Sequence, residues 1–153
     1  LIYGPGVKGN FHLLINLVKK GIPLPLRSIQ NKRSLIALDN LVDFIQLCAD
    51  RSRSPLAANE TFLVSDGIDV STSELFRAIA EAYDVPSRLF PFPALLLRFA
   101  AYSVGKNDVG NRLFGDLQID GSKAFDLLGW TPIVSMSKQL EKMVELERTE
   151  TSS

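Results

Sequence analysis

The sequence predicts an α/β fold with α+β character, built in a single domain from short strands and about six helices. Short apolar stretches alternate with stretches whose apolar residues recur at helical spacing, as expected for strands that lead into helices. A length of 153 residues suits one hydrophobic core. Glycine and proline mark most boundaries between these stretches. We expect an ordered chain over residues 1–148 and a disordered tail over 149–153.

The first elements show how the local sequence supports this expectation. Residues 1–3, "LIY", read as a strand, and residues 4–9 form a glycine-rich loop. A helix follows, with Asn10 as a plausible N-cap and Gly21 as its stop. The next helix begins near Asp39, and its inward residues are expected to be Leu41, Phe44, Ile45 and Cys48. The remaining predicted strands are 33–38, 60–67 and 117–120, and the remaining predicted helices are 73–83, 94–104, 121–129 and 135–148.

Three further segments carry local structural signals. Residues 23–26, "PLPL", should be extended at an edge, because each proline lacks an N–H donor and disfavours helix at the residue before it. Residues 105–116 are polar and contain several glycines, so we expect a functional or mobile loop there. Residues 71–74, "STSE", provide a hydroxyl cap and a glutamate for the helix that follows.

The charge balance excludes binding modes that need a broad basic field. Lys and Arg together number 17, as do Asp and Glu, so neither nucleic acid nor an anionic membrane is an expected partner. The single cysteine, Cys48, excludes a disulfide within the chain and fits a reducing, cytoplasmic setting. The apolar stretches are too short for a membrane span. A chain that opens directly on a strand also suggests a piece of a longer polypeptide.

The opening "GPGVKG" at residues 4–9 satisfies the pattern G-x-G-x-x-G between a strand and a helix. Such a turn can bring backbone N–H groups to a pyrophosphate. However, Pro5 removes one donor, no acidic residue follows about twenty positions later, and "PLPL" does not suit a central parallel strand. Three interpretations therefore stay open: a tight structural turn, a loop for some other anion, and a dinucleotide site.

Several stretches, in order, resemble the C-terminal portion of extended short-chain dehydrogenase/reductases of the nucleoside-diphosphate-sugar epimerase and dehydratase type. The resemblance covers nearly all of the chain and rests on "LIYGPG", "KRSLIALDNLVD", "TFLVSDGIDVSTSEL" and "DGSKAFDLLGWTP". It implies the substrate-binding lobe of a Rossmann-type enzyme. The N-terminal Rossmann part, with the glycine-rich NAD or NADP turn, is absent from these residues.

The resemblance also implies a substrate site. Arg33 and Arg112 match arginines that grip a nucleotide-sugar diphosphate, and a guanidinium pairs bidentately with phosphate oxygens. Asn10 matches an asparagine that faces the same diphosphate. Leu26 lies in a segment whose backbone borders the base. No catalytic, cofactor-binding or metal-binding residue is assigned within the chain.

The chain departs from the family pattern at several positions. Ser34 replaces the acid that commonly follows the arginine, and Asp39-Asn40 replaces the usual acidic pair. The catalytic Tyr-x-x-x-Lys pair would lie upstream. Tyr102 and Lys106 have this spacing, but Gly105 should end the helix between them, so they do not share a helical face.

These observations predict the nucleotide-binding part of an NAD-dependent UDP-sugar 4-epimerase, with UDP-hexose or UDP-N-acetylhexosamine as substrate. The isolated chain should lack catalytic activity. A 4-keto-sugar reductase or a 4,6-dehydratase is the alternative within the same class, and a stand-alone nucleotide-binding or interaction module is the alternative from another class. A homo-oligomer through the exposed apolar edge of residues 1–3 is also expected.

Overall fold

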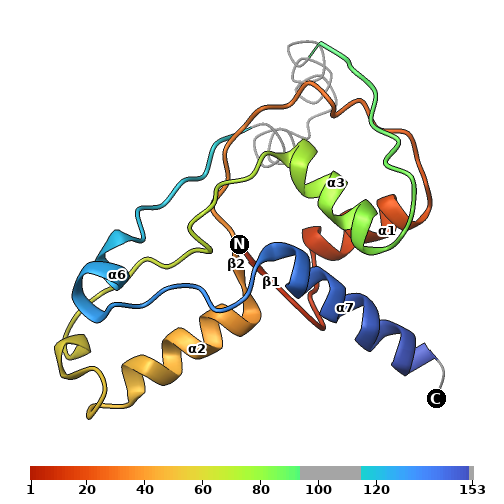
Figure 1. Cartoon of the computed structure of the whole chain (residues 1–153). Helices are drawn as coiled ribbons and strands as arrows, with labels where there is room; N and C mark the ends of the chain where they lie inside the picture. Colours follow the sequence, from red (N-terminus) through yellow and green to blue (C-terminus); the bar gives the residue numbers. More distant parts are fainter. Residues whose placement is uncertain (94–114, 152–153) are drawn as a thin grey trace. The chain divides into compact units, whose positions relative to one another are not determined.

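The computed structural model describes residues 1–93 and 115–151 (Figure 1). The chain forms two compact units, which we describe separately. Unit 1 comprises residues 1–7, 34–69 and 118–153, and unit 2 comprises residues 8–33 and 70–117. The mixed α/β class predicted from the sequence is confirmed. The expected helix 94–104 and most of the loop 105–116 lie outside the described residues.

Unit 1 contains a short parallel sheet followed directly by a helix. Strand β1 (Ile2–Tyr3) pairs with β2 (Ile36–Ala37), so that Ile2 lies opposite Ile36 and Tyr3 opposite Ala37. Helix α2 (Leu38–Ala49) begins immediately after β2. A Cβ atom at Gly4 would lie 2.5 Å from the Cβ atom of Leu38, so the chain turns after β1 where only glycine fits.

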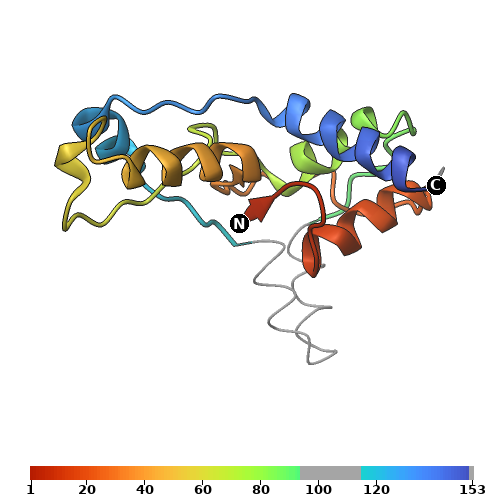
Figure 2. The same ribbon diagram turned by 90° about the horizontal axis from the view of Figure 1, so that it is seen from below.

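An aromatic cluster forms one end of unit 1. Phe44 of α2 meets Phe62 and Trp130 edge to face, with ring centroids 5.5 and 5.0 Å apart. The Trp130 indole donates to the Asp43 carboxylate at 2.8 Å, which satisfies its buried N–H. Helix α6 (Ser122–Leu128) lies beside the 3₁₀ turn η1 (Pro55–Ala57) (Figure 2). It ends as predicted at Gly129, which has a left-handed φ of 64°.

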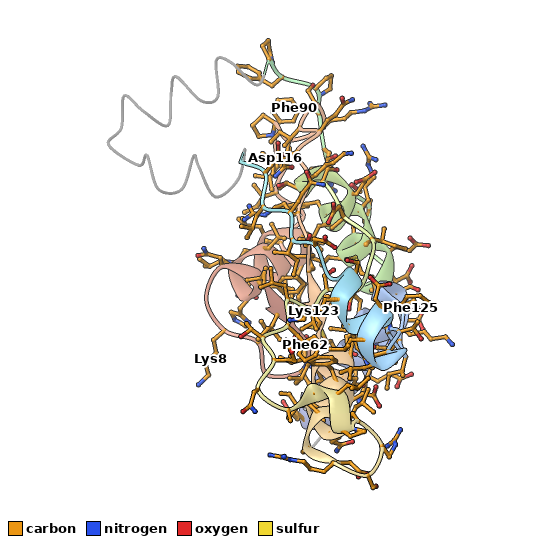
Figure 3. All side chains as sticks on the ribbon, turned by 90° about the vertical axis from the view of Figure 1, so that its left-hand side faces the viewer. Lys8, Phe62, Phe90, Asp116, Lys123 and Phe125 are labelled. Atoms are coloured by element: carbon orange, nitrogen blue, oxygen red, sulfur yellow. The ribbon has the colours of Figure 1, made fainter. Side chains whose placement is uncertain are left out.

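Lys123 connects α6 to the segment that contains Glu60 and Phe62. Its ammonium lies 2.7 Å from a carboxylate oxygen of Glu60 and 5.2 Å from the ring centroid of Phe62 (Figure 3). Helix α7 (Met136–Thr151) completes unit 1 and extends three residues beyond the expected end of the ordered chain. None of the described helices is both long and apolar enough to cross a membrane.

The Asp66 carboxylate joins the elements of unit 1. It accepts hydrogen bonds from the Tyr3 hydroxyl at 2.7 Å, from the Ala37 amide at 2.9 and 3.1 Å, and from the Asn40 side chain at 2.7 Å. The Asn40 oxygen in turn accepts from the amides of Ile133 and Val134, each at 2.9 Å. One carboxylate therefore connects β1, the start of α2 and the segment before α7. A negative charge at the N-terminus of α2 is also favourable.

Unit 2 is built on two helices that pack side by side. Helix α1 (Asn10–Lys19) contacts α3 (Thr72–Ala82) (Figure 1). Their buried apolar side chains are Phe11, Ile15 and Val18 on α1 and Leu75, Phe76 and Ile79 on α3. Ser71 and Glu74 form the capping box expected from "STSE". The "PLPL" segment is extended, with Leu24 bridged to Leu89.

Several local predictions differ from the structure. Residues 117–120 do not form a strand, and only Leu117 is bridged there, to Arg33. Residues 60–67 do not form a strand. Only the Asp66 amide of this segment bonds to the backbone beside it, at the Leu35 carbonyl, and the Asp66 side chain holds the segment in place of a ladder of backbone hydrogen bonds. Ile45 is 55% exposed, since it lies one helical position beyond the face of Phe44. Helix α2 begins one residue early, at Leu38. Gly9, with φ 70°, is the N-cap of α1, so Asn10 is the first helical residue.

The hydrogen bonds of Asp66 predict the effect of one conservative substitution. In Asn40→Asp, a second carboxylate replaces the amide that donates to Asp66 and to the Val134 carbonyl. We expect the free energy of unfolding to fall by about 2 to 4 kcal/mol, because two donors are lost and the carboxylates at positions 40 and 66 repel. Denaturant unfolding measures this change.

Gln46→Glu, which adds a carboxylate to an exposed position of the same helix, is the control and should change stability by less than about 0.5 kcal/mol. Equal effects of the two variants would contradict the role of Asp66.

A second prediction concerns pH. Burial, together with the hydrogen bond and the negative charge of Asp66, raises the pKa of Tyr3 above its ordinary value of 10.0. The unfolded chain therefore loses this proton more easily than the folded chain, and the stabilisation is complete below about pH 10 and is lost above it. At pH 11 the loss should reach about 1.4 kcal/mol. Comparison of unfolding free energies at pH 8 and pH 11 tests this. Tyr3→Phe should show a smaller decrease than the wild type, and an identical decrease would show that other groups cause it.

Candidate functional site

The predicted substrate-binding residues all belong to unit 2. Asn10, Leu26 and Arg33 are described, whereas Arg112 lies outside the described residues. Asn10 is exposed in the first turn of α1. Leu26 is buried, and its carbonyl accepts from the Ile29 amide at 3.2 Å. The backbone beside Leu26 bonds to Phe90, which keeps this segment extended as the resemblance implies.

Arg33 lies in a segment that has hydrogen-bonded neighbours on both edges. On one edge, the Arg33 amide and carbonyl each bond to Val70 at 3.0 Å. On the other edge, the Leu117 amide donates to the Lys32 carbonyl at 2.9 Å. Arg33 itself is half-buried. The residue is therefore held in place by backbone bonds to two parts of the chain that are distant in sequence.

Two polar side chains, which the sequence did not single out, reinforce this arrangement. The buried Asn31 accepts a hydrogen bond from the Thr72 amide at 2.9 Å and donates one to the Gly115 carbonyl at 3.1 Å. The Asp116 carboxylate accepts from the Lys32 amide at 2.7 Å. No sequence pattern marks such residues, because their partners are backbone groups that only the fold brings together.

Ser34, the residue after Arg33, has a carboxylate as its neighbour. Its hydroxyl donates to the Asp69 carboxylate at 2.6 Å and accepts from the Ile119 amide at 3.0 Å. The Gln118 side chain donates to the other oxygen of Asp69 at 2.5 Å. Asp69 therefore places a negative charge directly beside Ser34 within unit 1.

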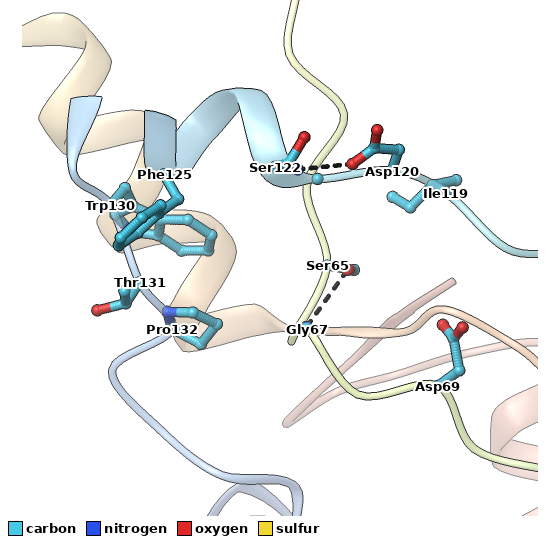
Figure 4. A pocket seen from close by; sticks show the side chains of 11 residues that line it. Ser65, Gly67, Asp69, Ile119, Asp120, Ser122, Phe125, Trp130, Thr131 and Pro132 are labelled. Carbon is cyan, nitrogen blue, oxygen red and sulfur yellow. Dashed lines mark hydrogen bonds between the residues drawn. The ribbon is translucent and has the colours of Figure 1, made fainter. Parts of the chain in front are cut away.

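Unit 1 also contains a pocket of about 360 Å³, drawn in Figure 4. Its carboxylates are those of Asp69 and Asp120, and its aromatic side chains are those of Phe125 and Trp130. None of its eleven lining residues is a lysine or an arginine. Such a lining disfavours an anionic diphosphate, and none of the predicted substrate-binding residues belongs to it. Within residues 1–93 and 115–151, no three His, Cys, Asp or Glu side chains gather as a metal site would require.

The family resemblance implies a tyrosine as the catalytic base, and the described tyrosines are Tyr3 and Tyr83. That base needs a lowered pKa, whereas burial raises the pKa of Tyr3. The ring of Tyr83 lies beneath the ammonium of Lys19, 5.1 Å from the ring centroid. Tyr102 and Lys106, which have the Tyr-x-x-x-Lys spacing, lie outside the described residues. The expectation that catalysis depends on other residues thus stays a prediction.

Comparison with known proteins identifies the family. No family model matches the chain. A UDP-glucose 4-epimerase of Vibrio cholerae is 51% identical over 133 residues, which are 86% of this chain and 40% of that protein. The chain is homologous to the C-terminal portion of UDP-glucose 4-epimerases, in the short-chain dehydrogenase/reductase family. It spans about two fifths of the length of this relative.

Solved structures support the same fold. A UDP-N-acetylglucosamine 4-epimerase of Bacillus cereus matches 96% of this chain and 44% of its own chain, with a TM-score of 0.67 and 16% identity. The Bordetella bronchiseptica enzyme WbmF, solved with NAD+ and UDP, matches 99% of this chain and 44% of its own, with a TM-score of 0.64 and 21% identity. The family resemblance read from the ordered motifs is confirmed.

Proposed function

We propose that this chain is the substrate-binding part of a UDP-sugar 4-epimerase and that it holds the nucleotide diphosphate through Asn10, Arg33 and Arg112. Leu26 would border the base with its backbone. The observation that carries this proposal is the pairing of residues 31–33 with residues 115–117. It brings Arg33 beside a segment that follows Arg112 by only three residues in the sequence.

The negative charge of a diphosphate must be neutralised, which supports a binding role for two arginines. The chain has no net charge, so its overall field does not attract an anion. A diphosphate carries two or more negative charges, and each guanidinium can donate two parallel hydrogen bonds to phosphate oxygens. Arg33 and Arg112 would neutralise most of that charge locally. Uridine is the nucleoside common to the named substrate of the Vibrio cholerae relative and the ligand of WbmF, so we assign UDP.

NAD, which accepts and returns the hydride in such enzymes, does not fit the opening glycine turn. Gly4 faces Leu38 and Gln139 at distances that leave no room for a side chain, so protein packing explains this glycine. Pro5 has no N–H to offer a pyrophosphate. We therefore assign residues 4–9 to a structural turn that leads into α1. The cofactor would be held by residues outside these 153, and no step of the reaction is assigned to the turn.

The proposal predicts which arginines matter for UDP. Arg33→Ala and Arg112→Ala should each weaken UDP binding by about 1.5 to 3 kcal/mol, the range for hydrogen bonds to charged groups. This corresponds to about a 10- to 150-fold higher Kd in calorimetry.

Arg77 provides the matched control. It is an arginine of the same unit on the exposed face of α3, and Arg77→Ala should leave the Kd for UDP unchanged within about twofold. An equal loss in the control would indicate a non-specific charge effect. Unchanged affinity in both Arg33→Ala and Arg112→Ala would overturn the assignment.

A further inference from the structure

We infer that Asn31 is a positioning residue for substrate binding, because it fixes the segment that carries Arg33 between the start of α3 and residues 115–117. The inference rests on the proposed function of Arg33. Asn31 itself need not contact the nucleotide. It acts on the backbone from which Arg33 extends.

The contacts of Asn31 are suited to this role. The side chain is 7% exposed, yet both of its polar atoms are satisfied by backbone groups from segments 41 and 84 residues away in the sequence. Its oxygen accepts from Thr72, in the first turn of α3, and its nitrogen donates to the Gly115 carbonyl. A buried amide with both hydrogen bonds made joins these two segments, whereas an unpaired one would be costly.

The neighbouring bonds explain why the effect reaches Arg33. Lys32 bonds to Asp116 and Leu117 on one edge of the segment, and Arg33 bonds to Val70 on the other. A segment held at three consecutive residues gives the arginine a fixed starting direction. Less conformational freedom is then lost when an anion binds.

Only an amide satisfies both partners of Asn31. An ionised aspartate keeps an acceptor for the Thr72 amide but has no hydrogen to donate to the Gly115 carbonyl. Asn31→Asp is therefore a selective variant, which breaks the link to residues 115–117 and retains the link to α3. Ser73→Ala is its counterpart, because the Ser73 hydroxyl donates to the Ile29 carbonyl at 3.0 Å and ties the preceding residues to α3 alone.

The test combines UDP calorimetry with amide hydrogen exchange on the 153-residue chain. Asn31→Asp should raise the Kd for UDP about 3- to 10-fold. It should also speed exchange of the Leu117 amide, which bonds to Lys32, without changing exchange within α3. The added negative charge of Asn31→Asp should by itself weaken UDP binding by the same factor with and without Arg33, so the part of the loss that disappears in an Arg33→Ala background measures the positioning effect. Ser73→Ala should leave the Kd unchanged. An equal loss of affinity with and without Arg33 would mean a general structural effect and would overturn the inference.

Asp116→Ala tests the same link from a solvent-exposed position, where folding should not be affected. Removing a negative charge should by itself favour an anionic ligand, whereas a loosened segment should weaken binding. We expect the Kd for UDP to rise about 2- to 5-fold. This is the effect of one lost hydrogen bond, reduced by the stronger attraction of the anion once the negative charge is removed. A lowered or unchanged Kd would contradict the positioning role.

The two proposals fail in different ways. If the wild-type chain does not bind UDP, the proposed function is wrong, and Leu117 exchange alone then decides whether Asn31 and Asp116 hold the segment. If UDP binds and depends on Arg33, but neither Asn31→Asp nor Asp116→Ala alters the Kd, only the positioning role is wrong.

Discussion

The Asp66 carboxylate is the interaction on which the arrangement of unit 1 depends. It receives hydrogen bonds from the Tyr3 hydroxyl, the Ala37 amide and the Asn40 side chain, which belong to β1, the end of β2 and α2. Through Asn40 it also reaches the segment before α7. Asn40 is fully buried, and a buried polar group is favourable only when its partners are present. One charged group thus contacts β1, β2 and α2, in addition to the apolar contacts around Phe44.

The departures from the family pattern become intelligible once the carboxylates are located. Asn40 stands where the pattern has an acid, and the structure provides Asp66 beside it; Ser34 stands where another acid is usual, and Asp69 lies beside it. In both cases a neutral side chain adjoins an acid from residues 66–69. Acids at both members of either pair would repel. In this chain, therefore, each of the neutral side chains at positions 34 and 40 is hydrogen-bonded to an acid.

Sequence reasoning succeeded where local chemistry determines structure. The Ser71 cap, the left-handed Gly129, the extended "PLPL" and the strand at residues 2–3 each follow from neighbouring residues. Asn10, Leu26 and Arg33, which it assigned to a substrate site, belong to one unit, and that assignment stays a prediction. It failed for residues 60–67 and overlooked Asp66, Asn31 and Asp116. These residues form hydrogen bonds with groups that are distant in the sequence, so no spacing pattern reveals them.

Unit 1 contains a pocket lined by the carboxylates of Asp69 and Asp120, so its charge is negative. Unit 2 contains Arg33, whose backbone is fixed by neighbouring segments and whose side chain is positive. The proposed function requires UDP to bind in unit 2. An NMR titration of the 153-residue chain with UDP tests this requirement. We expect amide shift changes at Asn10, Leu26 and Arg33, with Gly67 and Gly121 of the pocket unaffected. Changes confined to the pocket glycines, or none at saturating UDP, would contradict it.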